Sequence, residues 1–165
     1  MRLPNLVSQL QGSNRRSIGQ SNQVVRLVRT QPKLFRELIA CLWSENAVLR
    51  SGAADAAEKV SRDNPRLLDR CKSQLLGLLA EIDQIELRWH LAQMIPRLTL
   101  TPPERKRAAA ALPRYLDDRS SIVRTFALQA LVDLSRNDTA LLHESKQLLE
   151  TALLSGTPAM KARAR

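Results

Sequence analysis

The sequence predicts an all-α protein built from repeated pairs of antiparallel helices. Alanine, leucine and arginine, which are among the best helix formers, dominate the composition, whereas glycine occurs only five times. Apolar residues recur at helical spacing, and prolines and capping residues interrupt them at regular places. With 44% hydrophobic and 25% charged residues, the chain of 165 residues can form a globular core.

The N-terminal segment, residues 1–21, is polar and basic, and it contains the pair Arg15–Arg16. We expect it to form either a flexible arm or one short amphipathic helix followed by a linker. A basic arm of this kind could contact nucleic acid or an acidic partner, although a run of charge is more often simply solvated. Residues 22–31 should form a short helix that packs on the first full pair.

Four helix pairs are expected in the rest of the chain. Pro65 suits the first turn of a helix, where the missing N–H has no partner to lose. Thr101 and Glu104 have the spacing of a capping box, and Asn137 or Asp138 can cap the first helix of the last pair. The pairs are expected at about residues 32–62, 65–98, 102–135 and 139–165.

A basic residue recurs at the start of each second helix. Three copies have an apolar residue, then arginine, then a face rich in Ala and Leu; they lie at 45–60, 83–98 and 119–134. Their arginines, Arg50, Arg88 and Arg124, are spaced by 38 and 36 residues, and a weaker fourth copy places Lys161 another 37 residues along. Repeats of about 37–47 residues with two helices each are typical of α-solenoids.

The stretch LPRYLDDRSSIVRTFALQAL, residues 112–131, resembles a HEAT repeat. Its first helix carries Pro113 near the end, the acidic turn Asp117–Asp118 follows, and Val123 precedes Arg124. The resemblance covers about residues 22–165. It implies a HEAT-like, armadillo-like domain: a right-handed α-solenoid of about four antiparallel pairs, whose second helices line a concave surface.

The recurring cations allow two interpretations. In HEAT-like stacks a repeated arginine often reaches an acidic residue of the adjoining turn, which forms a structural ladder; the candidate acids are Glu45, Asp83, Asp117 and Asp118. Alternatively, a row of exposed cations binds an acidic partner or phosphates; its members are Arg50, Arg88, Arg124 and Lys161. Trp89 either packs between repeats or offers a stacking platform beside this row.

The net charge of +10 is concentrated at the two ends of the chain. Residues 1–36 contain seven basic side chains and residues 156–165 contain three, and neither segment contains an acid. Of the 26 basic residues, 16 therefore lie in residues 37–155, together with all 16 acids. This balance argues against a DNA-binding surface that covers the whole domain.

The cysteines and the apolar pattern indicate a cytoplasmic protein. Cys41 and Cys71 lie in leucine-rich helical stretches, so we expect buried free thiols. The beginning of the sequence lacks the apolar run of a signal peptide, and no stretch reaches the about 18 apolar residues of a membrane span. His90 has Glu86 four residues before it, a pair that is more often a surface salt bridge, and His143 and Glu144 are adjacent and face different directions. We therefore expect no cofactor or metal.

The expected function is binding without catalysis. We expect a scaffold that binds a protein partner through the second helices, with nucleic-acid binding by the basic arm and the arginine row as the alternative. A third possibility is alkylpurine DNA glycosylase activity, since some HEAT-like proteins have it and place a carboxylate about one turn beyond a tryptophan. Here the turn after Trp89 offers Gln93, and the turn after Trp43 offers Ala47, which disfavours that activity.

Overall fold

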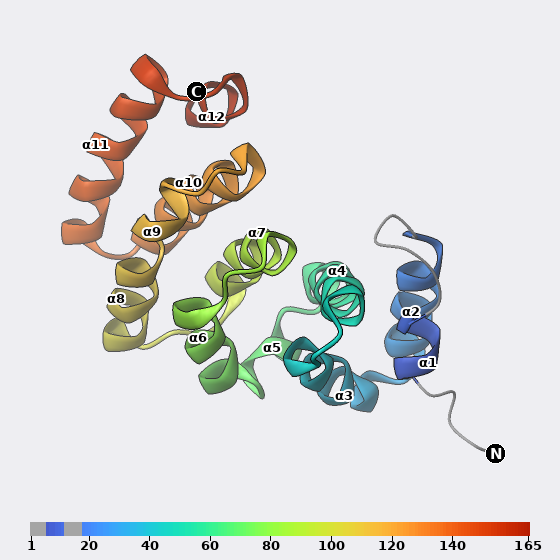
Figure 1. Cartoon of the computed structure of the whole chain (residues 1–165). Helices are drawn as coiled ribbons and strands as arrows, with labels where there is room; N and C mark the ends of the chain where they lie inside the picture. The colour runs from blue at the N-terminus through green and yellow to red at the C-terminus, as the bar shows by residue number, and fades with distance from the viewer. Residues whose placement is uncertain (1–5, 12–17) are drawn as a thin grey trace. The chain divides into compact units, whose positions relative to one another are not determined.

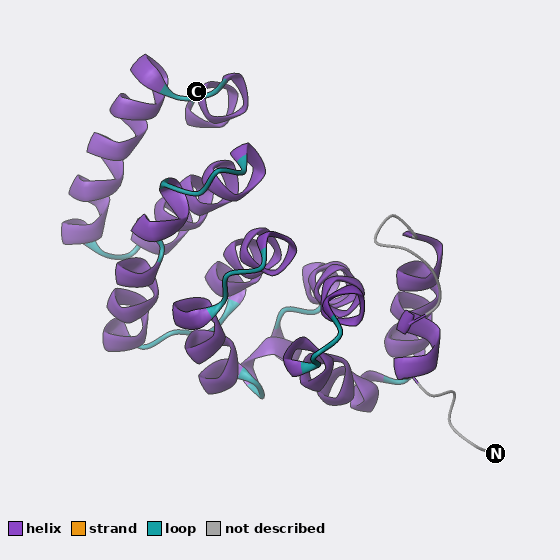
Figure 2. Ribbon diagram, in the orientation of Figure 1, coloured by secondary structure: helices purple, strands orange, loops and turns teal. Residues whose placement is uncertain are grey.

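Every regular element in the described part of the chain is a helix, which confirms the predicted all-α class (Figures 1 and 2). The computed structural model describes residues 6–11 and 18–165. The chain divides into two compact units, Met1–Lys72 and Ser73–Arg165.

The first unit contains helices α1 to α5 and two 3₁₀ helices. Their bounds are α1 Leu6–Gln11, α2 Ile18–Thr30, η1 Pro32–Leu34, α3 Phe35–Ala40, η2 Cys41–Trp43, α4 Ala47–Asp63 and α5 Arg66–Asp69. Helix α2 therefore begins inside the segment predicted as an arm, and it runs across the expected boundary between residues 21 and 22.

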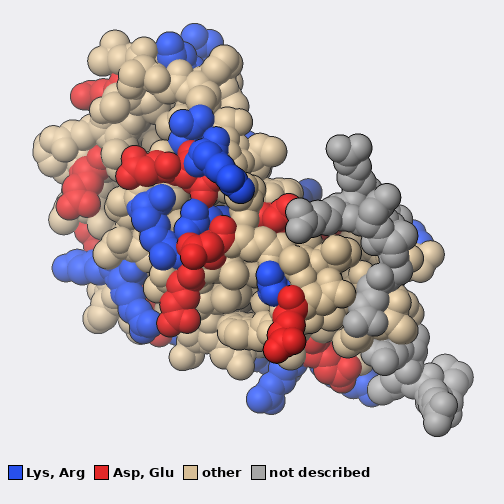
Figure 3. All heavy atoms as spheres, in the orientation of Figure 1, with Lys and Arg blue, Asp and Glu red and all other residues tan. Residues whose placement is uncertain are grey.

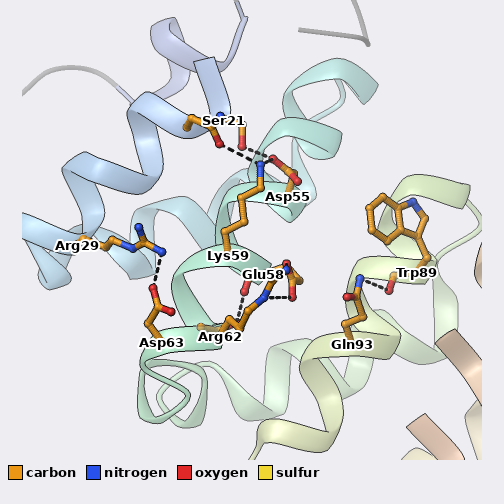
Figure 4. A network of polar contacts seen from close by, with 11 residues as sticks. Ser21, Arg29, Asp55, Glu58, Lys59, Arg62, Asp63, Trp89 and Gln93 are labelled. Atoms are coloured by element: carbon orange, nitrogen blue, oxygen red, sulfur yellow. Dashed lines mark hydrogen bonds and ion pairs between the residues drawn. The ribbon is translucent and has the colours of Figure 1, made fainter. Parts of the chain in front are cut away.

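Helices α2 and α4 lie side by side in the first unit (Figure 1). Four buried alanines of α4, at positions 53, 54, 56 and 57, leave room for close approach because their side chains are small. Polar contacts line the same seam: Ser21 donates to Asp55, and Arg29 pairs with Asp63 (Figure 4). Lys59 Nζ donates to Asp55 Oδ2 at 2.7 Å.

The second unit contains helices α6 to α12, of which α6 starts at the last residue of the first unit. Their bounds are α6 Lys72–Glu81, α7 Ile85–Met94, η3 Ile95–Arg97, α8 Pro102–Ala111, α9 Pro113–Leu116, α10 Ser121–Ser135, α11 Thr139–Ser155 and α12 Pro158–Ala164. The predicted capping box of Thr101 and Glu104 is confirmed at the start of α8. Asp138, one of two predicted caps, accepts from the first N–H groups of α11.

Three helices that lie where second helices were expected pack in succession, α7 against α10 and α10 against α12 (Figure 1). Helix α10 has the largest share of the core among them, because eight of its positions are buried. Helix α11 contacts α10 and α12 but buries only Ser145 and Ala152. Because α10 contacts both α7 and α12, side chains from these three helices can line one surface.

Several predicted helices are interrupted rather than continuous. The first helix of the pair expected at 102–135 is divided at Leu112 into α8 and α9, because Pro113 has no N–H to continue the helical hydrogen bonds. The expected second helix at 83–98 ends in the 3₁₀ turn η3, which contains Pro96. The free, buried state predicted for Cys41 and Cys71 is confirmed.

Candidate functional site

Arg88, at the start of α7, is bonded to acceptors in two successive turns of the second unit. Its Nε donates to the carbonyl oxygen of Ile82 at 2.9 Å, and its Nη2 donates to Asp83 Oδ1 at 2.7 Å. Its Nη1 donates to Asp118 Oδ2 at 2.6 Å, across 30 residues of sequence. The side chain of Asp118 is only 3% exposed, so this ion pair is largely removed from water. These contacts join the turn after α6 to the turn after α9.

The same cluster closes the C-terminal end of α6. Tyr115 is fully buried, and its hydroxyl donates to the carbonyl oxygen of Leu79 at 2.9 Å. Arg114 donates to the carbonyl oxygen of Ile82 at 2.9 Å. The guanidinium groups of Arg88 and Arg114 lie 5.2 and 5.4 Å from the centroid of the Tyr115 ring. The last carbonyls of a helix need such donors, and here two arginines and a tyrosine supply them.

The cluster also changes the ionisation of its buried groups. Burial raises the pKa of Tyr115 to about 12. Burial alone would raise the pKa of Asp118 as well, but hydrogen bonds from the Ser120 N–H and from Arg88 outweigh it and hold that pKa below its usual value. Asp118 is therefore a carboxylate that is ionised and fixed in place.

Arg50, in the first unit, has a related but different role. Its Nη1 donates to the carbonyl oxygens of Ser44 at 2.6 Å and of Glu45 at 3.1 Å. The contact with Glu45 is thus to its backbone, whereas the sequence suggested its carboxylate. Asn46 caps α4 in the same turn by accepting from Val48 N at 2.9 Å. Arg50 stabilises the turn that leads into α4.

Arg124, at the start of α10, has a different environment from Arg50 and Arg88. Its Nε is buried, and within the described residues it has no hydrogen-bond partner. The side chain lines a pocket of about 490 Å³ between α9, α10, α11 and α12, here called the Arg124 pocket. Asp117, predicted as a ladder acid, also lines this pocket and is exposed.

The remaining predicted residues are dispersed. Lys161 lies in α12 and is half-buried. Trp89 stacks on His90, with 3.5 Å between ring centroids, and its ring centroid lies 5.8 Å from that of Phe126 in α10. It therefore packs between successive second helices, as one of its two interpretations expected. The pair Arg15–Arg16 lies outside the described residues.

A second pocket, of about 660 Å³, opens on the second helices themselves. Helix α7 with η3, helix α10 and helix α12 all contribute to its lining, and we call it the second-helix pocket. Its polar and aromatic lining side chains are Gln93, Arg97, Phe126, Gln129, Asp133, Arg136, Asn137 and Arg163. None of them belongs to the predicted row of cations.

Charge in the second-helix pocket is mainly positive. Asp133 is the one carboxylate of its lining, and it accepts from Gln129 Nε2 at 3.0 Å and pairs with Arg136 at 2.8 Å. The guanidinium of Arg163 lies 5.5 Å from the centroid of the Phe126 ring. Three guanidinium groups beside one carboxylate favour an acidic or mixed polar surface on a partner.

Part of this pocket has a signal in the sequence. The fifth and ninth residues after each repeated arginine are polar: Gln93 and Arg97 after Arg88, and Gln129 and Asp133 after Arg124. After Arg50 the same positions hold Asp55 and Lys59, whose side chains bond to α2. Arg136 has only a partial signal, because the residue twelve positions after the repeated arginine is Arg62 in the first copy but Leu100 in the second. Arg163 has none.

Comparison with protein-family models, with curated proteins and with solved structures finds no match to this chain. No helix in the described part of the chain has the length and apolar character needed to cross a membrane. Within residues 6–11 and 18–165, no three His, Cys, Asp or Glu side chains gather as metal ligands would.

Proposed function

We propose that this chain is a non-enzymatic, HEAT-like α-solenoid that binds a protein partner through the second-helix pocket. Support for the repeat architecture comes from the recurrence of helix pairs at about 37 residues and from the successive packing of α7, α10 and α12. The observation that carries the binding proposal is a pocket of about 660 Å³ to which all three of these helices contribute.

The side chains of the second-helix pocket suit protein recognition. Arginine and aromatic residues are enriched among the energetically important residues of protein interfaces, and here Arg163 lies over Phe126 while Arg136 remains 71% exposed. Gln93 and Gln129 add amide groups that can donate and accept. The ladder arginine Arg88 is already bonded within the chain, so it is not part of the proposed contact surface.

A protein partner is favoured over nucleic acid by the arrangement of charge. On the face drawn in Figure 3, Lys and Arg side chains alternate with Asp and Glu, whereas a nucleic-acid-binding face usually carries a continuous basic field. Within the basic N-terminal part, Arg29 is paired with Asp63.

The proposal can be tested by site-specific photo-crosslinking in cells. A photoreactive residue at Gln129, inside the pocket, should crosslink to a protein, and Arg136→Glu or Arg163→Glu should abolish the product. A photoreactive residue at Arg107, which is exposed on α8 and outside the pocket, is the matched control position. Arg107→Glu is the matched control substitution, because it makes the same change of charge.

Two outcomes would contradict the proposal. A product at Gln129 that survives both charge reversals would show that the pocket is not the contact surface. A product that disappears after nuclease treatment, with binding that weakens steeply between about 50 and 300 mM salt, would support the nucleic-acid alternative. Circular dichroism of each variant verifies that helicity is retained.

A further inference from the structure

The Arg124 pocket contains a cation that forms no ion pair within the described residues. Arg88 shows what a ladder arginine receives when its partners are present: an acid five residues before it, Asp83, and an acid thirty residues after it, Asp118. For Arg124 the corresponding positions hold Arg119 and Leu154. Leu154 is 82% exposed and offers no acceptor side chain.

Arg124 has a buried donor without an acceptor among the described residues. The Nε of Arg124 has no hydrogen-bond partner within the described residues, and a buried donor without an acceptor is unfavourable by an amount comparable to a lost hydrogen bond. The guanidinium lines a pocket of about 490 Å³, which is within the range of small-molecule sites. A carboxylate that entered the pocket could accept from this group.

The other side chains that line the Arg124 pocket indicate which chemical groups the rest of the ligand carries. Apolar side chains from four elements surround the space: Leu116, Leu128, Leu148 and Met160. The hydroxyl groups of Thr151 and Ser155 already donate to backbone carbonyls, so they offer no free donor. A ligand that matches this pocket has one carboxylate for Arg124 and an apolar body.

Asp117 limits the charge of that ligand. Its carboxylate lines the same pocket and forms no ion pair with Arg124 in the described structure. A dianion would meet one cation and one anion, and its second charge would be repelled. A monoanion can bind Arg124 while its apolar part separates the charge from Asp117.

We infer that the pocket between α9, α10, α11 and α12 binds a small, apolar monocarboxylate, with Arg124 as the residue that holds the carboxylate. This inference does not depend on the proposed partner surface, because the two pockets share no lining residue.

Octanoate is a suitable probe, and the full chain is titrated with it by NMR and calorimetry. We expect shifts of the Arg124 Nε–H signal and of amides in α9 to α12. Arg124→Gln should weaken binding by about tenfold or more, since a charge-assisted hydrogen bond is lost. The octanoate affinity of Arg124→Lys should lie between those of the wild type and Arg124→Gln, because lysine keeps the charge but lacks the planar guanidinium group.

Two comparisons make the test specific. Asp117→Asn should tighten octanoate binding, and octyl phosphate, which is mostly dianionic at neutral pH, should bind the wild type more weakly than octanoate. Arg136→Gln removes a cation from the other pocket and should leave the affinity unchanged.

Absence of binding at millimolar octanoate would overturn the inference. Equal affinity of the wild type and the folded Arg124→Gln variant, or equal binding of octanol, would also overturn it.

Discussion

Arg88 illustrates how one side chain connects separate parts of the second unit. Its guanidinium bonds a carbonyl at the end of α6, the turn acid Asp83 and the buried Asp118 beyond α9. The guanidinium also lies over Tyr115, whose hydroxyl bonds the same end of α6. Because the donors of one guanidinium satisfy acceptors from two turns, its loss affects both turns together.

We predict that Arg88→Ala lowers the free energy of unfolding by about 3 kcal/mol, because the substitution leaves Asp118 buried and unpaired. Arg124→Ala is the matched control, since Arg124 lies in the first turn of α10 yet its Nε has no hydrogen-bond partner among the residues that the structure describes. That variant should change stability by less than about 1 kcal/mol, mainly through lost packing of the side-chain stem. Urea denaturation followed by circular dichroism measures both values.

The pH dependence of the unfolding free energy tests whether the ionised carboxylate of Asp118 is the source of this stability. The pKa of Asp118 is lowered in the folded state, so the unfolded chain binds its proton more readily. The stabilisation is therefore complete above the unfolded pKa of about 3.9 and disappears as pH falls through the folded pKa. The stability difference between the wild type and Asp118→Asn should narrow below about pH 4. If the stability difference between the wild type and Asp118→Asn stays constant below about pH 4, the destabilisation is due to altered packing and not to the lost charge.

Of the predicted arginine–acid ladder, the described residues contain the pairs of Arg88 alone, with Asp83 and Asp118. Arg88 and the acids Asp83, Asp117 and Asp118 are recognisable from the repeat, yet only the structure shows that Asp118 faces inward and Asp117 outward. That choice depends on the backbone of a two-residue turn, where Asp118 also accepts from the Ser120 N–H. Arg114 and Tyr115 are not recognisable as partners, because their acceptors are backbone carbonyls.

At the scale of single elements, local chemistry predicts where helices begin better than where they continue. The capping box of Thr101 and the cap of Asp138 are local patterns, and both are confirmed. The interruption at Leu112 follows from Pro113 and the turn at the end of α7 contains Pro96, whereas the turn at the end of α3 has no proline to mark it. The second-helix pocket could not be predicted, since it requires knowing that α7, α10 and α12 are neighbours.

Glycines inside the helices allow a prediction at this scale. An added Cβ at Gly77 in α6 would meet nothing within 4 Å, so Gly77→Ala should raise the unfolding free energy by about 0.5–1 kcal/mol. At Gly52 in α4 the Cβ would lie 3.3 Å from Leu10, and the gain should be smaller or absent. At Gly156 it would lie 2.4 Å from the carbonyl oxygen of Ala152, which predicts a loss.

Chemical denaturation of the three alanine variants ranks them by their free energy of unfolding. We expect Gly77→Ala to be the most stable and Gly156→Ala the least. If Gly77→Ala is no more stable than the wild type, the space that the structure shows beside Gly77 in α6 is not free.

At the scale of the whole molecule, charge and burial are both distributed unevenly. The net charge of +10 arises at the two ends of the sequence, and the acids of the chain are matched in number by bases between them. Burial is also uneven within the second unit: α10 buries eight positions, whereas α11 buries two over 17 residues. Proteins open locally where few apolar contacts hold a segment.

Native-state hydrogen exchange on the full chain should reveal this gradient. We predict that amides of α11 and α12 exchange faster than those of α7 and α10, because the exposed Leu142, Leu153 and Leu154 contribute little to the core. Arg88 contacts the turn after α6 and the turn before α10, so Arg88→Ala should reduce the protection of these two helices and narrow their difference from α11. Equal protection from Ser73 to Arg165 in the wild type would contradict the prediction, since it would mean that the unit opens only as a whole.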